Sequence, residues 1–439
     1  MPDHVVLLSI PALRQQDVAL MPRLQSLVGA GDVAELVPGF PALTCTVQAN
    51  MTTGLPPSEH GVVANGFYWP EQQAVEMWTS PNGCVDRPQL WDILHKHDPT
   101  LRSAVWFPLH SKECGADTIC TPAPIHNPDG SESLWCYTRP ESLYAELLNE
   151  FGHFPLQHFW GPMANIKSSA WIVDSAIHAA DSYRPNLFYI YLPHLDYAAQ
   201  KSGPDSDAAR RALLDLDAEI GRLIDGFAAA YGDEHLLWLV ASEYVITPVN
   251  HVSYPNRVLR EAGLLAVREE EDGEHLDIAG SQAWALVDHQ MSHVFVRDAD
   301  VLDQTADLLA HQAGVAEVLS RDQLDRYDLE HARCGDLVVV STPDSWQAYY
   351  WWLEDNKAPK FARTVDIHRK PGYDPVEMYW DAEHKCIPLD TSLVQGSHGA
   401  PPHTPQQRGV LLSSEQGVFV ERPLGDVDVA DIVLRQFGI

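Results

Sequence analysis

Apolar runs and amphipathic helical stretches alternate along most of the chain. Continuous apolar runs at residues 4–10, 186–192 and 236–241 are typical of strands that are buried on both faces of a parallel sheet. Helical periodicity is found in residues 168–181 and in the long stretch 205–231. This alternation predicts an α/β fold, in which a doubly wound, mostly parallel sheet is flanked by helices.

Two segments interrupt this pattern. Residues 108–165 are rich in Pro, His, Trp and Cys and contain few periodic stretches. Residues 343–395 are again irregular and carry many aromatic side chains. We therefore expect a single domain over residues 1–439, with an irregular insertion at 108–165 and an aromatic, cap-like segment at 343–395.

The charge of the chain limits its partners. Its 439 residues include 61 acidic and 29 basic side chains, which gives a formal net charge of −32. Nucleic acids and anionic membranes both attract basic surfaces, so this charge argues against either as a partner. A phosphorylated small molecule remains compatible with it, provided that a metal ion or a local cluster of donors supplies positive charge. The sequence does not indicate an oligomeric state.

The compartment is predicted from two features. No stretch approaches the roughly 20 apolar residues of a membrane span, and the first apolar run lacks a basic flank, so we interpret it as a strand and not as a signal peptide. The seven cysteines form no Cys-x-x-Cys pair and are odd in number. Both features favour a reduced, cytoplasmic protein.

Polar residues that follow the predicted strands are the first candidates for a site, because ligands of such sheets bind at the carboxyl ends of the strands. Thr44 precedes a helical stretch, where a hydroxyl group serves either as a helix cap or as part of an anion site. Asp196 follows the strand at 186–192, and in an extended chain His194 points to the same side. Glu243 follows the strand at 236–241.

Two motifs carry a family resemblance. The first combines Thr44 with Thr53-Gly54, Pro57, His60-Gly61 and Asn65, and the second is Gly396-Ser397-His398-Gly399. In this order they resemble the alkaline phosphatase superfamily, and within it the type I phosphodiesterase and nucleotide pyrophosphatase branch. The resemblance covers nearly the whole chain. It implies the superfamily's doubly wound fold, with two metal ions, usually zinc, at the strand ends.

The resemblance also assigns roles. Thr44 corresponds to the nucleophile, and Asn65 to an asparagine that hydrogen-bonds the phosphate. In the family, two cations neutralise the phosphoryl oxygens, and a covalent phosphothreonine is then hydrolysed by water. Asp196 and His398 correspond to metal ligands of that family.

The chain departs from the family at several metal ligands. Pro11 replaces an aspartate, Gln200 replaces a histidine, and Glu243-Tyr244 replaces an Asp-His pair. A catalytic zinc normally has three protein ligands, and beside Thr44 only Glu243 remains for that role.

The other metal position keeps more of its ligands. It retains Asp196 and His398, and His194 is a candidate third ligand. We therefore expect one divalent ion, zinc, and not two. His251 and His289 are further candidate ligands.

The aromatic segment is a candidate rim of a substrate pocket. Within residues 346–380, the adjacent His368, Arg369 and Lys370 are candidates for binding a substrate phosphate. The simpler alternative is that the aromatic side chains cover a small subdomain and the charges face solvent.

These observations predict hydrolysis of a phosphodiester, nucleotide pyrophosphate or related phosphoryl compound through Thr44. The alternative is a catalytically degenerate homologue that binds a phosphorylated ligand without turnover, with Thr44 and Asn65 as an anion cradle. Pro11, Gln200 and Tyr244 favour this alternative. A transferase or isomerase on the same fold is a third possibility.

Overall fold

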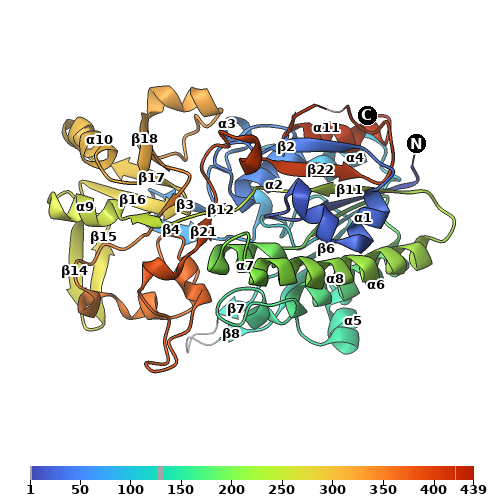
Figure 1. Cartoon of the computed structure of the whole chain (residues 1–439), viewed down its shortest axis with the longest axis horizontal. Helices are drawn as coiled ribbons and strands as arrows, with labels where there is room; N and C mark the ends of the chain where they lie inside the picture. Colours follow the sequence, from blue (N-terminus) through green and yellow to red (C-terminus); the bar gives the residue numbers. More distant parts are fainter. Residues whose placement is uncertain (1, 127–131, 421) are drawn as a thin grey trace.

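A nine-stranded sheet forms the centre of the larger part of the molecule (Figure 1). The computed structural model describes residues 2–126, 132–420 and 422–439. In spatial order the strands are β23 (Leu424–Gly425), β2 (Val33–Val37), β22 (Gly409–Ser413), β11 (Leu236–Ala241), β1 (His4–Ser9), β10 (Leu187–Tyr191), β5 (Ser103–Trp106), β6 (Thr118–Pro122) and β9 (Cys136–Arg139). The five central strands from β11 to β6 are parallel, whereas β22 and β9 run antiparallel to their neighbours. The predicted α/β architecture is confirmed.

Helices cover both faces of this sheet, as its alternating side chains require. Val6 and Leu8 of β1 share a core with α1 (Pro22–Val28), α6 (Lys167–Tyr183) and α8 (Asp207–Tyr231). Val5 and Leu7 point to the opposite core, which contains α2 (Thr44–Thr53), α4 (Leu90–His97) and α11 (Asp428–Arg435). The remaining helices are α3 (Pro57–His60), α5 (Ser142–Phe151) and α7 (His194–Ser202) around the large sheet, and α9 (Pro255–Glu261) and α10 (Leu302–Ala310) beyond it.

A second, smaller sheet has its own core at the other end of the molecule (Figure 1). Its order is β16 (Ala283–Asp288), β17 (Met291–Val296), β19 (Leu337–Ser341) and β18 (Val315–Ser320), and all neighbours are antiparallel. The side chains of Trp346 and Tyr349–Trp352 are buried in this core. This burial agrees with the alternative in which the aromatic side chains cover a subdomain.

Short pairs and turns complete the chain. The two-stranded pairs are β3 (Gly66–Trp69) with β4 (Ala74–Met77), β7 (Ile125–His126) with β8 (Glu132–Ser133), β12 (Thr247–Pro248) with β21 (Gly396–Ser397), β13 (His251–Ser253) with β20 (Ser345–Gln347), and β14 (Ala266–Glu270) with β15 (Gly273–Asp277). Short 3-10 helices lie at Gln15–Leu20, Asn82–Cys84, Leu156–His158, Ala299–Val301, Arg321–Tyr327, Asp355–Lys357, Lys360–Arg363, Pro375–Met378, Thr391–Leu393 and Pro405–Gln407.

The expectation that residues 108–165 are irregular needs correction. The segment 108–165 contains β6 and β9, which extend the large sheet at its edge. Strands of four or five residues are too short to show a clear period in the sequence, which explains why the segment looked irregular.

Two findings bear on the predicted compartment. Within the described ranges, no helix is long and apolar enough to cross a membrane. All seven cysteines are free, and six of them are buried.

Candidate functional site

The candidate site lies where the carboxyl edge of the large sheet meets the turn between β16 and β17. Thr44 comes from the start of α2, Asp196 from α7, and Tyr244 from the loop after β11. His398 comes from the segment that returns to β22. Contacts through Tyr244 bring Thr44, Asp196 and His398 together.

Thr44 is the first residue of α2, and its side chain is 3% exposed. Leu43 before it is extended, so the chain enters the helix at Thr44. The first N–H groups of a helix have no partner within the helix and carry partial positive charge. The Thr44 hydroxyl oxygen therefore lies beside backbone donors that favour an anion. At its other end, α2 stops at Gly54, which has a positive φ of 70°.

Tyr244 connects the nucleophile candidate with the carboxylate of α7. Its hydroxyl group lies 2.9 Å from the Thr44 Oγ1 atom and 3.4 Å from Asp196 Oδ1. Gln200 donates a hydrogen bond of 2.7 Å to the other carboxylate oxygen of Asp196, and accepts one of 2.7 Å from the Tyr373 hydroxyl. Burial raises the pKa of Asp196 to about 7, although the hydrogen bonds from Gln200 and Tyr244 act to lower it.

His398 is oriented by its backbone contact and by neighbouring rings. Its Nδ1 atom lies 2.7 Å from the carbonyl oxygen of Ala42, which fixes that nitrogen as the donor. The ring of Tyr244 stacks on the imidazole at 3.6 Å between centroids and 4° between planes, and His289 lies 4.0 Å away on centroids. Burial lowers the pKa of His398 well below its ordinary value, so the imidazole is neutral. Its buried Nε2 has no hydrogen-bond partner among the described residues.

Glu243 is buried beside α2. Its Oε1 atom accepts hydrogen bonds from Ser9 Oγ at 2.6 Å and from Gln48 Nε2 at 2.8 Å. Its Oε2 atom is buried and has no partner within the part of the chain that the structure describes. Burial raises the pKa of Glu243 to about 8, against the effect of the hydrogen bonds from Ser9 and Gln48.

Asn65 is held against the start of α2. Its Oδ1 atom accepts a hydrogen bond of 3.0 Å from the backbone N–H of Cys45, the residue after Thr44. Its Nδ2 atom donates one of 3.0 Å to Asp288, which also accepts the Asn65 backbone N–H at 2.8 Å. An amide nitrogen carries two hydrogens, so this geometry leaves one more to offer to a ligand.

The prediction that His194 points to the same side as Asp196 assumed an extended chain, and it is wrong. His194 and Asp196 both lie in the first turn of α7. Residues two apart on a helix point to nearly opposite sides, so the two side chains do not share a face. Burial lowers the pKa of His194 to about 4, and the charge that raises it in part comes from Asp215 of α8.

The basic trio of the aromatic segment is divided between surface and interior. Arg369 is exposed and forms an ion pair with Asp366. Lys370 is 1% exposed, and its ammonium group lies 2.8 Å from Asp374 and 2.6 Å from Glu377. The exposed Arg369 is therefore the more accessible of the two cations.

The donor set allows a test of the implied metal ions. Asp196 and His398 both contact Tyr244, and His398 offers a neutral, buried Nε2 whose ring is oriented by the hydrogen bond from Nδ1 to the Ala42 carbonyl oxygen, as metal-binding imidazoles are. These two residues are the donors of the candidate site that could hold a cation. The position beside Thr44 does not fit a second, because Pro11 has no donor side chain and Tyr244 is a hydrogen-bonded phenol.

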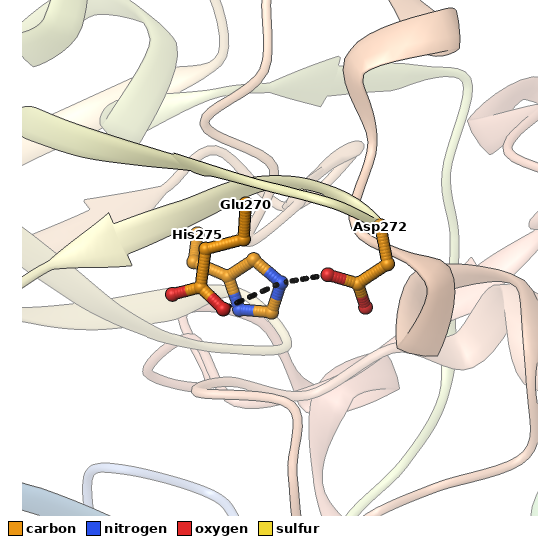
Figure 2. A group of neighbouring side chains, drawn as sticks. All are labelled: Glu270, Asp272 and His275. Carbon is orange, nitrogen blue, oxygen red and sulfur yellow. Dashed lines mark hydrogen bonds and ion pairs between the residues drawn. The ribbon is translucent and has the colours of Figure 1, made fainter.

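Only one group of three potential ligands converges within 4.8 Å in the described ranges, and it lies elsewhere. Figure 2 shows Glu270, Asp272 and His275 at the turn between β14 and β15. His275 Nε2 lies 2.7 Å from Asp272 Oδ1, and Arg268 approaches Glu270 at 3.5 Å. These are ion pairs of a largely exposed hairpin, so they do not form part of the candidate site.

Sequence reasoning missed several residues of the site. Asp288 holds Asn65, and Gln48 holds Glu243, yet neither follows a predicted strand of the large sheet. His289 was only a candidate of unknown position, and it stacks on Tyr373 at 3.5 Å between centroids. His251 bonds to Ser345 in β20 and shows no contact with the site residues. The spacing of Gln48, one turn after Thr44, was the one available signal.

Comparisons with known proteins agree with this architecture. An uncharacterized pyrophosphatase/phosphodiesterase of Schizosaccharomyces pombe is 25% identical over 249 residues, which is 56% of this chain and 45% of the yeast protein. The chain thus matches less than half the length of that relative.

Solved structures show the same fold. Phosphonoacetate hydrolase from Sinorhizobium meliloti 1021, in complex with phosphonoformate, has a TM-score of 0.63 at 16% identity, with 99% of this chain and 96% of that chain covered. Murine ectonucleotide pyrophosphatase/phosphodiesterase 5 has a TM-score of 0.64 at 13% identity, with 99% and 95% covered. The family model for type I phosphodiesterase / nucleotide pyrophosphatase matches residues 5–374, and its members are typically metal-dependent. The chain therefore belongs to the type I phosphodiesterase/nucleotide pyrophosphatase family, within the alkaline phosphatase superfamily.

Proposed function

We propose that the protein hydrolyses a phosphodiester, a nucleotide pyrophosphate or a related phosphoryl compound, with Thr44 as the nucleophile. The observation that carries this proposal is the position of Thr44, a hydrogen-bonded hydroxyl group in the first turn of a ten-residue helix. In the reaction the Thr44 oxygen gives up its proton and forms a bond to phosphorus, the bond from phosphorus to the leaving oxygen breaks, and the leaving group takes up a proton as it departs. Water then hydrolyses the phosphothreonine and releases the second product.

The residues around Thr44 have defined tasks in this proposal. The backbone donors at the start of α2 and the Asn65 amide bind the phosphoryl oxygens. Asp196 and His398 hold one divalent cation, most simply zinc, because a carboxylate and an imidazole suit zinc better than magnesium. When bound, this ion supplies the positive charge that buried carboxyl groups cannot give to a phosphate.

The substrate is proposed to be a small phosphorylated molecule. Related folds bind such ligands: the hydrolase from Sinorhizobium meliloti was crystallised with phosphonoformate, and an inactive variant of the murine protein with AMP. His368, Arg369 and Lys370 remain candidates for contacts to the substrate; His368 and Arg369 are exposed, and Lys370 is buried. We further propose a cytoplasmic location, which is supported by the seven free cysteines.

A second candidate function is ligand binding without turnover. It is favoured by the hydrogen bond that already occupies the Thr44 hydroxyl and by the proline at position 11. In that case Thr44 and Asn65 form an anion cradle only.

An assay with an aryl phosphodiester separates the two functions. Thr44→Ala removes the attacking oxygen and should abolish nearly all hydrolysis, while Thr44→Ser retains an oxygen and should keep part of it. Thermal unfolding of both variants checks that the fold is intact. If the parent protein binds a phosphorylated ligand in a titration but releases no product, the second function is correct. Hydrolysis that survives Thr44→Ala would exclude Thr44 as the nucleophile.

A further inference from the structure

We propose that Tyr244 positions the Thr44 hydroxyl group for attack and replaces the second cation that the resemblance places beside the nucleophile. The inference rests on the proposed function for its catalytic part. Its structural part, the replacement of a cation by a phenol, can be tested without turnover.

The hydroxyl group of Tyr244 lies beside the Thr44 oxygen, on a residue that stands where the resemblance implies a histidine ligand for the second cation. It is within 2.9 Å of the Thr44 oxygen and 3.4 Å of an Asp196 oxygen, and Tyr244 is 1% exposed. A buried phenol that contacts both groups satisfies their hydrogen-bonding capacity. It thereby gives the Thr44 oxygen a fixed partner, as the cation beside the nucleophile would.

The ring of Tyr244 is held on one face, and its backbone is held as well. One face stacks on His398, nearly parallel at 4°. The carbonyl oxygen of Tyr244 accepts hydrogen bonds from the Ala12 backbone N–H at 2.9 Å and from Ser242 Oγ at 3.1 Å. Ala12 directly follows Pro11, which stands where the resemblance implies a metal-binding aspartate. The loop after β1 therefore supports Tyr244 through its backbone.

This support has a consequence for Thr44. A threonine side chain has few χ1 rotamers, and one hydrogen bond to the oxygen of a rigid phenol is enough to select among them. Small errors in the position of an attacking atom reduce rates strongly, because near-attack geometry must be met within fractions of an ångström. A fixed hydroxyl group at position 244 is therefore a means to orient the nucleophile when one cation is missing.

Tyr244→Phe tests the positioning role, because it keeps the ring and its stacking and removes only the hydroxyl group. We expect kcat to fall by about 10- to 100-fold with KM unchanged, and the bound metal to stay at the level of the parent protein. Tyr231→Phe is the matched control, since it removes another buried tyrosine hydroxyl, which bonds to Pro185 far from the site. An unchanged kcat in Tyr244→Phe would overturn the proposal.

A second variant tests the replacement of the cation directly. Pro11→Asp combined with Tyr244→His restores both lost ligands next to Thr44 and Glu243. Elemental analysis after dialysis against zinc should then show one equivalent more than in the parent protein, together with a higher melting temperature in zinc. If this variant folds and binds no more zinc than the parent protein, the proposal that Tyr244 replaces the second cation is wrong. If the parent has no hydrolase activity, the proposed function fails, while the gain of metal still decides this inference.

Discussion

The side-chain amide of Gln200 donates a hydrogen bond of 2.7 Å to Asp196, one turn earlier on α7. Position 200 is a histidine in the family resemblance, so the substitution removes a metal ligand. The structure shows that it also gives the remaining carboxylate a neutral partner, which is in turn held by the Tyr373 hydroxyl. We therefore expect the change to reduce the metal-binding capacity of the site, while the amide of Gln200 satisfies the Asp196 carboxylate that is left.

Gln200→His should therefore strengthen metal binding at Asp196 and His398. A third protein ligand commonly distinguishes a tight zinc site from a weak one, and we expect the Kd for zinc to fall by about 10- to 100-fold. Isothermal titration with zinc measures it, and Gln200→Leu, which offers no ligand, serves as the control. Equal affinities of the histidine and leucine variants would contradict the assignment of this ligand position.

The parent protein should hold one equivalent of divalent metal, and His398→Ala should lose it. The reason is that His398 offers a neutral, buried nitrogen without a partner among the described residues, and that its ring stacks on Tyr244, which also contacts Asp196. His194→Ala is the control, because the helical geometry of α7 turns that side chain away from Asp196. Elemental analysis after dialysis measures the bound metal in the parent protein and in both variants. Two equivalents in the parent would show that other residues replace the lost ligands, and none would support binding without catalysis.

How much of this site was predictable depends on whether a residue lies at a strand end. Thr44, Asp196, Glu243 and His398 follow strands or sit in motifs, so their positions could be inferred from order and spacing alone. His194 could not be placed correctly, because the prediction assumed extended backbone where α7 begins at that very residue.

The contribution of the second sheet was not predictable. Asp288 and His289 belong to its first hairpin, which the pattern of strands and helices does not place beside the larger sheet. Only the tertiary arrangement brings the Asp288 carboxylate to Asn65. A long-range contact of this kind leaves no periodic signal in the sequence.

Lys370 and Arg369 should respond differently to substitution. Lys370→Met would leave the Asp374 and Glu377 carboxyl groups buried together without their cation, and we expect a loss of about 3–5 kcal/mol in the free energy of unfolding. Arg369→Ala removes a surface pair and should cost about 0–1 kcal/mol. Urea denaturation measures both, and a loss in Lys370→Met of no more than that in Arg369→Ala would contradict a structural role for Lys370.

Arg369→Ala should instead affect ligand binding. If the exposed guanidinium group contacts the phosphate of the substrate, its removal should weaken binding of a phosphate-bearing ligand by about 1–3 kcal/mol. A titration of this variant against the parent checks the prediction. Unchanged affinity would leave the segment around residue 369 with a structural role only.

Asp426 should make the protein less stable as pH rises from about 4 to 6. The carboxylate accepts hydrogen bonds from Asn50 and from the backbone N–H of Gly39, but burial raises its pKa from 3.8 to about 6. Between these values the native state keeps a proton that the unfolded chain has lost. The stability from this group is therefore fully present below pH 3.8 and is lost as pH rises through 6. At about 1.4 kcal/mol per pKa unit, the loss amounts to as much as about 3 kcal/mol.

Asp426→Asn cannot ionise and should remove this part of the pH dependence. Urea denaturation of the parent and the variant at pH 4, 5, 6 and 7 gives the difference in free energy of unfolding, in which the contributions of other buried carboxyl groups cancel. The difference should move in favour of the variant up to pH 6 and then remain level. Asp431→Asn, on the exposed side of α11, is the control and should leave the profile of the parent unchanged. A difference that does not change between pH 4 and 6 would show that Asp426 titrates at its ordinary value in the folded protein.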